Sequence, residues 1–264
     1  TGQQIYRSTF TKEILHAVQV RTSSQGLRGP ELDPSHSRYR ILGVGDSVTF
    51  GQGVEEDETW LSVFAKSTSA HVEVLNGAVP SWDLVSELAW IERYGWKLEP
   101  DHVLLAFYIN DIQPSPRSSP EQESRKILKI APKWATREAG YRRMSYLYNA
   151  ICRFQEHQRL VKELGLPEPS MRDNRYTYFD ELKKDLDPEK LRTQYASLAT
   201  SCSEHHIPCT VVILPIFVNG GSSYGNDILK TIAEIASGAG LEVVHLEDTV
   251  KDISPYDLYV MPAD

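Results

Sequence analysis

The sequence has few cysteines, only three in 264 residues. Cys152, Cys202 and Cys209 are too few for the set of several bridges that holds small secreted folds together. One pair can form, and one thiol is then left over. The cysteine count therefore leaves the redox compartment undecided.

Long apolar runs and an excess of positive charge are also missing. No stretch of about 18 apolar residues occurs, so the sequence offers no membrane span, and no signal peptide is visible. Acidic residues outnumber basic ones and the formal net charge is −8, which argues against binding to nucleic-acid phosphates. The chain begins with Thr1 rather than Met, which fits a processed form and leaves a lost leader or anchor open.

The sequence does contain short apolar runs that alternate with helical patterns. Between the runs, apolar residues recur every three to four positions, as in helices with one buried face. This alternation indicates a parallel sheet covered on both sides, so we predict a three-layer, flavodoxin-like α/β fold with a five-stranded parallel sheet. The strands are expected at Tyr39–Val44, Val72–Leu75, His102–Tyr108, Cys209–Leu214 and Glu242–Leu246.

Three helices are expected between these strands. One carries apolar residues from Leu84 to Ile91, and another runs from Asn226 to Ser237. A third begins at Asp187-Pro188, because Asp caps helix starts and Pro fits the first turn, and it runs toward His205.

Two parts of the chain lie outside this alternation. Residues 1–38 are polar and irregular, with one short amphipathic piece at Ile14–Val20, and we predict an extension that packs on or beside a domain spanning residues 39–264. Residues 113–187 contain no convincing strand, and we predict a helical insertion there that caps one end of the sheet.

The stretch from Ile41 to Val54 joins the first strand to a glycine-rich turn that contains Asp46 and Ser47. A dinucleotide loop needs Gly or Ala where Val48 stands, and a nucleotide P-loop needs Gly-Lys-Ser/Thr, which is absent. A plain structural turn fits the glycines. A nucleophile turn fits as well, because it places Ser47 at the carboxyl end of a strand, where open α/β sheets bind ligands.

Three motifs at successive strand ends resemble those of the SGNH (GDSL-type) serine hydrolases. Gly45-Asp46-Ser47, followed by Thr49, Gly51 and Gly53, resembles their first block. Val74-Leu75-Asn76-Gly77-Ala78-Val79-Pro80 resembles the second block, and Tyr108-Ile109-Asn110-Asp111 resembles the third. Upstream, Gly26-Leu27-Arg28-Gly29 is similar to a segment of envelope-associated members, which slightly favours an extracytoplasmic location.

The resemblance implies a role for each block. Ser47 is the expected nucleophile, and its backbone amide is expected to share the oxyanion hole with the side chain of Asn110. The amide of Gly77 or Ala78 is the expected third donor. We also place Asp46 and Tyr108 at the substrate pocket, where Tyr108 replaces the usual glycine and narrows the space. No metal and no organic cofactor is implied.

A serine nucleophile needs an adjacent base, which the family supplies from an Asp-x-x-His or Asp-x-His segment after the last strand. Asp264 matches the Asp, and no histidine follows it within the 264 residues. We expect the natural chain to continue to that histidine; a shortened chain or a pseudoenzyme are the alternatives. His245, at the end of the fifth strand, is a weaker candidate for the base, because its neighbours alternate as in a strand and favour a packed or hydrogen-bonded structural histidine.

The spacing Cys202, His205, His206, Cys209 is superficially that of a zinc site. Four tetrahedral ligands need a wrapping loop, however, and this segment is the end of a helix running into a strand. We therefore favour a helix cap with a buried cysteine.

Taken together, these features predict a serine-dependent ester hydrolase with a small-molecule, glycan or lipid ester as its substrate. The first alternative is an O-acyltransferase acting on a cell-surface glycan. The second is a non-catalytic binding domain that lacks the histidine. The acyl and alcohol groups and the oligomeric state are left open, because a fold does not choose among them.

Overall fold

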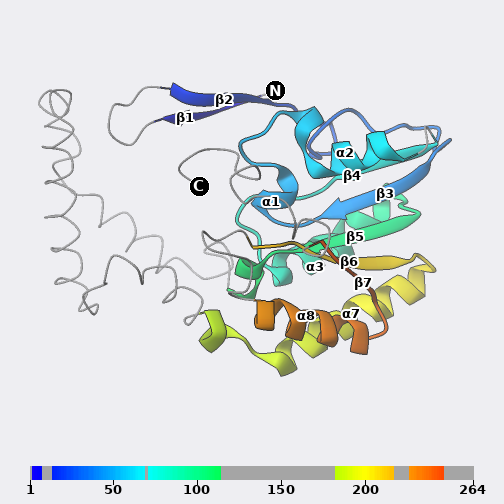
Figure 1. Cartoon of the computed structure of the whole chain (residues 1–264). Helices are drawn as coiled ribbons and strands as arrows, with labels where there is room; N and C mark the ends of the chain where they lie inside the picture. Colours follow the sequence, from blue (N-terminus) through cyan, green and yellow to red (C-terminus); the bar gives the residue numbers. More distant parts are fainter. Residues whose placement is uncertain (1, 8–13, 69–70, 114–181, 217–225, 247–264) are drawn as a thin grey trace, which may run out of the picture.

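Five parallel strands form the central sheet of the computed structural model, which describes residues 2–7, 14–68, 71–113, 182–216 and 226–246. The order across the sheet is β4-β3-β5-β6-β7 (Figure 1). This arrangement confirms the predicted five-stranded parallel sheet. The strands are β3 (Tyr39–Val44), β4 (Val72–Asn76), β5 (His102–Phe107), β6 (Cys209–Ile213) and β7 (Glu242–His245).

The central strands are apolar on both faces, because both faces are covered. Along β5, Val103, Leu105 and Phe107 pack into the larger of two hydrophobic clusters, and Ala106 packs into the smaller one on the opposite face. This alternation follows from the two-residue period of a strand. A continuous apolar run such as that of β5 is therefore the sequence of a doubly covered strand.

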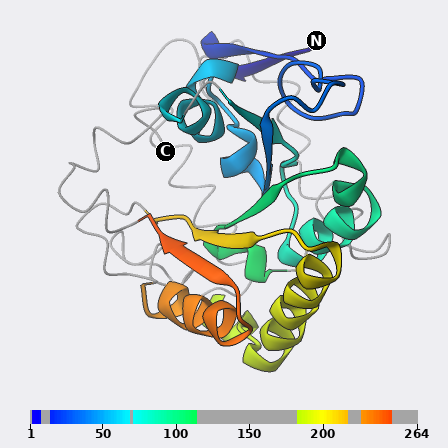
Figure 2. The ribbon, with the colours of Figure 1, turned by 90° about the vertical axis from the view of Figure 1, so that its right-hand side faces the viewer.

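Helices cover the two faces unequally in the described part of the chain. Three helices contribute side chains to the larger cluster: α3 (Leu84–Arg93), α7 (Pro188–His205) and α8 (Asn226–Gly238). Helix α2 (Trp60–Ser67) places Trp60 against the smaller cluster. Figure 2 shows α7 and α8 side by side below the sheet.

The predicted helix start at Asp187-Pro188 is confirmed. The Asp187 side chain accepts hydrogen bonds from the amides of Glu189 and Lys190, at 3.1 Å each. Asp83 caps α3 in the same way through the amide of Ser86. Such caps satisfy amides that the first helical turn leaves without acceptors.

The N-terminal segment is more regular than the sequence indicated. Strands β1 (Gly2–Arg7) and β2 (Ile14–Val20) pair as an antiparallel hairpin, so the piece expected only to be amphipathic is a strand. The amide of Gly53, at the end of the first block, donates to Gln4 Oε1, and the amide of Gln19 donates to the carboxylate of Glu55 just after that block. The predicted helical insertion at 113–187 lies almost entirely outside the described residues.

Cys202 and Cys209 form a disulfide between the last turn of α7 and the first residue of β6, with Cα atoms 6.2 Å apart. Both cysteines are buried, and His206 caps the end of α7, as expected; the two cysteines form the one pair that the sequence allows. The two sulfurs are bonded to each other and are not free to ligate zinc. The ring of His205 stacks on Trp96, and its Nδ1 lies 2.9 Å from the carbonyl oxygen of Ser201. Among the described helices, none is both long and apolar enough to cross a bilayer.

Candidate active site

Ser47 lies just beyond the carboxyl end of β3, as the first residue of the helical turn α1 (Ser47–Phe50). Gly45 makes the tight connection possible, because a Cβ at this position would lie 2.5 Å from Thr49 Oγ1 and 3.0 Å from the carbonyl oxygen of Ala106. Gly51 ends the turn with a φ of 79°, a conformation that favours glycine. The first block is thus a strand–turn–helix junction that presents a half-buried serine.

Asp46 connects the nucleophile turn to the rest of the site. Its side chain is completely buried. One carboxylate oxygen accepts a hydrogen bond from the amide of Val48, at 2.9 Å, and thereby caps α1. The other accepts from Asn110 Nδ2 at 3.2 Å and lies 3.4 Å from Ser47 Oγ. Asp46 thus lies beneath Ser47 and Asn110 with no exposed surface, and its predicted place at the substrate pocket stays a prediction.

Asn110 reaches Asp46 from the neighbouring strand end. It belongs to the short 3-10 helix η3 (Ile109–Ile112), which follows β5, and β5 pairs directly with β3. The side-chain amide has two N–H groups, and only one of them is engaged by Asp46. The structure therefore brings Ser47 and Asn110 to one carboxylate, as their predicted common role requires, and leaves a second N–H on Asn110.

The two amides expected from the second block are already engaged. Gly77 donates its backbone N–H to the carbonyl oxygen of Gly43 at 2.8 Å, and Ala78 donates its own to Asn76 Oδ1 at 3.1 Å. Ala78 is 3 % exposed. Either amide would have to give up its present bond to bind an oxyanion. The structure thus shows the second block tying its loop to β3, and the oxyanion role of either amide stays a prediction.

Tyr108 stands between β5 and η3 and is half-buried. Its side chain packs against both hydrophobic clusters. Its amide donates to Asp111 Oδ2 at 2.7 Å, so Asp111 caps the turn that contains Asn110. The side chain of Tyr108 therefore packs against the core. Its predicted role in narrowing the substrate pocket stays a prediction.

A group of buried acids lies behind these residues, and sequence reasoning missed it. Glu87, on α3, has no exposed surface, and no described residue hydrogen-bonds to its carboxyl oxygens. Burial raises the pKa of Glu87 well above its usual range, and the charges of Asp46 and Asp83 raise it further. Burial likewise raises the pKa of Asp111, with a further rise from Glu87. Both carboxyls therefore bind a proton more readily than exposed acids do.

The tyrosine on α7 faces the same buried acids. Tyr195 has no exposed surface, and its hydroxyl has no hydrogen-bond partner among the described residues. Burial raises its pKa, and Asp111 and Glu87 add to the shift. A signal for this group was present in the sequence, because Glu87 falls on the apolar face of its helix, three positions after Leu84 and four before Ile91.

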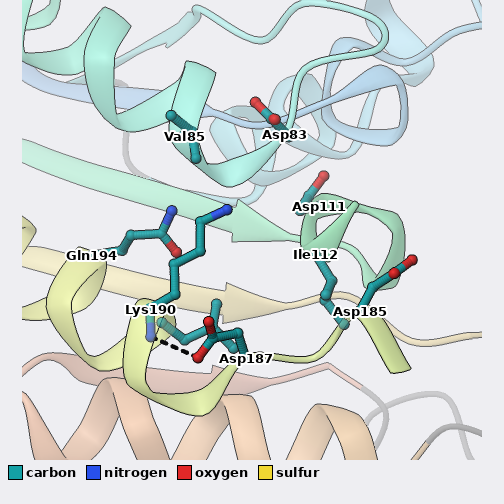
Figure 3. Close-up of a pocket in the computed structure, with 9 residues that line it drawn as sticks. Asp83, Val85, Asp111, Ile112, Asp185, Asp187, Lys190 and Gln194 are labelled. Carbon is teal, nitrogen blue, oxygen red and sulfur yellow. Dashed lines mark hydrogen bonds between the residues drawn. The ribbon is translucent and has the colours of Figure 1, made fainter. Parts of the chain in front are cut away.

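A small hollow opens between α3, η3 and the start of α7 (Figure 3). The Lys190 side chain extends from α7 into it, and Figure 3 shows Asp111 above that side chain and Asp187 below it. The space is about 20 Å³, which is too small for an ester substrate. We therefore assign no substrate to this hollow. Its lining residues are Asp83, Val85, Asp111, Ile112, Asp185, Asp187, Lys190, Leu191 and Gln194.

The position of His245 argues against its serving as the base. It ends β7, which is separated from β3 by β5 and β6. Adjacent strands lie about 4.8 Å apart, so three spacings put its backbone about 14 Å from the strand that leads to Ser47, beyond the reach of two side chains. Asp264 lies outside the described residues, and its predicted role stays a prediction.

Comparison with solved structures gives distant likenesses. No family model matches the chain, and no curated protein matches it. Among solved structures, TesA is 12% identical, with a TM-score of 0.45 and coverage of 81% of this chain and 83% of that chain. AlinE4, an SGNH-hydrolase family esterase, is 14% identical, with a TM-score of 0.45 and coverage of 84% and 82%. The lipase/acylhydrolase from Enterococcus faecalis is 13% identical, with a TM-score of 0.43 and coverage of 81% and 78%. These values are too low for the likenesses to bear on the chemistry of the site.

Proposed function

We propose that the protein is a serine-dependent ester hydrolase with Ser47 as its nucleophile. The observation that carries the proposal is the buried carboxylate of Asp46, which contacts both the Ser47 hydroxyl and the Asn110 amide. A structural turn needs no such link between the ends of two strands. A nucleophile and an oxyanion donor do need it, because both must be fixed before the substrate arrives.

The chemistry assigned to the site is acyl transfer through a covalent serine ester. Ser47 Oγ attacks the ester carbonyl carbon while a base takes its proton, and the leaving alcohol departs with a proton from the same base. Water then hydrolyses the acyl-serine. The base is proposed to be a histidine oriented by Asp264, as the resemblance implies, and both lie outside the described residues.

Two donors are proposed to hold the oxyanion. The backbone amide of Ser47 is at the first position of a helical turn, where amides lack intrahelical acceptors, and no acceptor is recorded for it among the described residues. The second N–H of the Asn110 side chain is the other donor. Each fixed donor of this kind contributes about 10²–10³ in rate.

The test uses the chain in the length that its gene encodes, with p-nitrophenyl acetate as substrate and a fluorophosphonate as covalent label. We expect Ser47→Ala to lower turnover by at least about 10⁴-fold and to abolish labelling of the peptide that contains residue 47. Ser203→Ala is the matched control, because Ser203 is exposed on the last part of α7, at the amino-terminal edge of the sheet. We expect it to behave like the wild type.

The two alternatives predict different results. An O-acyltransferase would be labelled at Ser47 but would transfer acyl groups to a sugar hydroxyl faster than to water. A binding domain would show neither labelling nor Ser47-dependent turnover. Absence of both signals from the wild-type chain would overturn the proposal.

A further inference from the structure

The nucleophile turn is held from outside the sheet by a segment that precedes it in the sequence. Residues 21–29, here called the strap, fold back on themselves: the amide of Ser23 donates to the carbonyl of Leu27 at 2.8 Å, and that of Gly29 donates to Arg21 at 3.0 Å. Leu27 is buried in the larger hydrophobic cluster. The strap is therefore anchored in the domain and is not a loose extension.

The Arg28 guanidinium donates to three carbonyl oxygens in and just after the first block. Its Nη1 donates to Phe50 at 2.6 Å and to Gly51 at 2.5 Å, and its Nη2 donates to Val54 at 2.6 Å. The guanidinium carbon lies 4.7 Å from the centre of the Phe50 ring. Arg28 is only 4 % exposed, so these bonds are shielded from water and are stronger than surface contacts.

Phe50 is the last residue of the turn that begins at Ser47, Gly51 caps it, and Val54 lies in the loop that follows. The last carbonyls of a helix have no intrahelical donors, and a cation near them is favourable. A single helical turn is not stable on its own, so α1 depends on such outside contacts. The link continues to the nucleophile, because the amides of Gly51 and Gln52 donate to the carbonyl of Ser47, at 3.1 Å and 2.9 Å.

The strap is joined to the second block as well. The amide of Arg28 donates to the carbonyl of Asn76 at 2.9 Å. The side chain of Asn76 in turn donates to the carbonyl of Thr49 at 3.0 Å and accepts from the amide of Ala78. Arg28 thus contacts the first block through its side chain and the second block through its backbone.

We propose that Arg28 is a positioning residue for the reaction at Ser47. It fixes the far end of α1, and so holds the Ser47 amide and hydroxyl in place relative to Asn110. This inference rests on the proposed function. The planar guanidinium is suited to the task, because it bonds to several carbonyls at once in a fixed geometry, whereas a lysine ammonium is a compact charge on a flexible stem.

The test compares Arg28→Met and Arg28→Lys with the wild type in ester hydrolysis and in the rate of fluorophosphonate labelling. We expect kcat and the labelling rate of Arg28→Met to fall by about 10- to 100-fold, the cost of a small misplacement of reacting groups, with KM little changed. Arg28→Lys is expected to restore only part of the loss. A third variant, Arg28→Ala, tests rescue by the missing group. Guanidinium ion at sub-denaturing concentration is expected to speed the fluorophosphonate labelling of this variant but not that of the wild type.

Two control variants separate positioning from stability. Arg21→Met removes an exposed arginine of the same strap, which pairs with Glu56, and we expect its kcat to equal that of the wild type. Ile232→Ala opens a cavity at a fully buried position of α8, so it lowers the melting temperature without touching the nucleophile turn. At a matched loss of melting temperature, its kcat is expected to exceed that of Arg28→Met.

Each outcome decides the proposal. It is overturned if Arg28→Met retains wild-type kcat, or if its loss of kcat is no greater than that of Ile232→Ala at equal stability. Should Arg28→Met fail to fold, the same comparison is made with Arg28→Lys. If the wild-type chain shows no Ser47-dependent labelling, the proposed function fails and this inference fails with it. If the wild type is labelled and the Arg28 variants are labelled at the same rate, only this inference fails.

Discussion

Asn110 donates a hydrogen bond to Asp46, and the same buried carboxylate caps the helical turn that carries Ser47. The nucleophile and the side-chain donor are therefore not placed independently. A change at Asp46 should disturb both of them, whereas a change at Asn110 removes only the donor.

We expect Asn110→Ala to lower kcat by about 10²–10³-fold, the typical loss for one oxyanion donor. Asp46→Asn should also lower kcat, because the new amide group cannot accept from both Val48 and Asn110 through two carboxylate oxygens. Steady-state kinetics on the two single variants and the double variant check the link. If Asp46 acts through Asn110, the fold-reduction in kcat of the double variant is smaller than the product of the fold-reductions of the two single variants. Fully multiplicative losses would show that the two residues act separately.

Glu87 predicts an unusual dependence of stability on pH. Its pKa is raised in the folded state from an ordinary value of 4.5, so above that pH the folded chain binds more protons than the unfolded chain, and stability falls as the pH rises. Glu87→Gln mimics the protonated form. We expect the variant to lose less melting temperature than the wild type between about pH 5 and about pH 8, and to be the more stable of the two at the upper end.

The control for this prediction lies on the same helix. Glu92 is exposed on α3, and Glu92→Gln should reproduce the wild-type curve. Parallel curves for all three proteins would show that Glu87 is ionised in the folded state.

Gly45 predicts a steric effect next to the nucleophile. The added methyl group in Gly45→Ala would lie 3.0 Å from a backbone oxygen of β5 and 2.5 Å from Thr49 Oγ1. We expect a loss of about 1–3 kcal/mol in the free energy of unfolding, together with a lower kcat, measured by denaturant unfolding and ester hydrolysis. Gly238→Ala, at the end of α8, meets nothing within 4 Å and should be neutral or stabilising by up to about 1 kcal/mol.

The Cys202–Cys209 disulfide predicts a loss of stability without a loss of chemistry. It closes a short loop at the amino-terminal edge of the sheet, and Ser47 follows the carboxyl end of β3. Replacing both cysteines by serine should lower the free energy of unfolding by about 2 kcal/mol and leave kcat unchanged. A reducing agent should lower the melting temperature of the wild type to about that of the double variant. It should have no effect on the double variant.

The strand positions were predictable because a strand that is buried on both faces is a short, continuous run of apolar residues. The first predicted strand, Tyr39–Val44, has the same bounds as β3, and the predicted His102–Tyr108 exceeds β5 by one residue. Asp187-Pro188 was equally clear, since capping chemistry is local. The meeting of Ser47 and Asn110 at one sheet edge followed from the order of motifs at strand ends.

The parts that were missed depend on partners distant in sequence. The hairpin β1–β2 bonds to Gly53 and Glu55, at and just after the end of the first block, and no local pattern shows such partners. The hydrogen bonds that engage the amides of Gly77 and Ala78 depend on Gly43 and on the rotamer of Asn76. A motif gives the identity of a residue near a site, but it does not show whether that residue's amide is free.

The contact between Arg28 and the first block changes where the functional unit begins. A gene fragment starting at Tyr39 would encode every strand of the parallel sheet and all three motifs, yet it would lack the guanidinium that bonds to the carbonyls of Phe50, Gly51 and Val54. Such a fragment would retain the reacting serine and lose a support for it. The smallest unit worth expressing on its own therefore starts before Arg21, and grafting the motifs onto another parallel sheet would require transplanting this preceding segment as well.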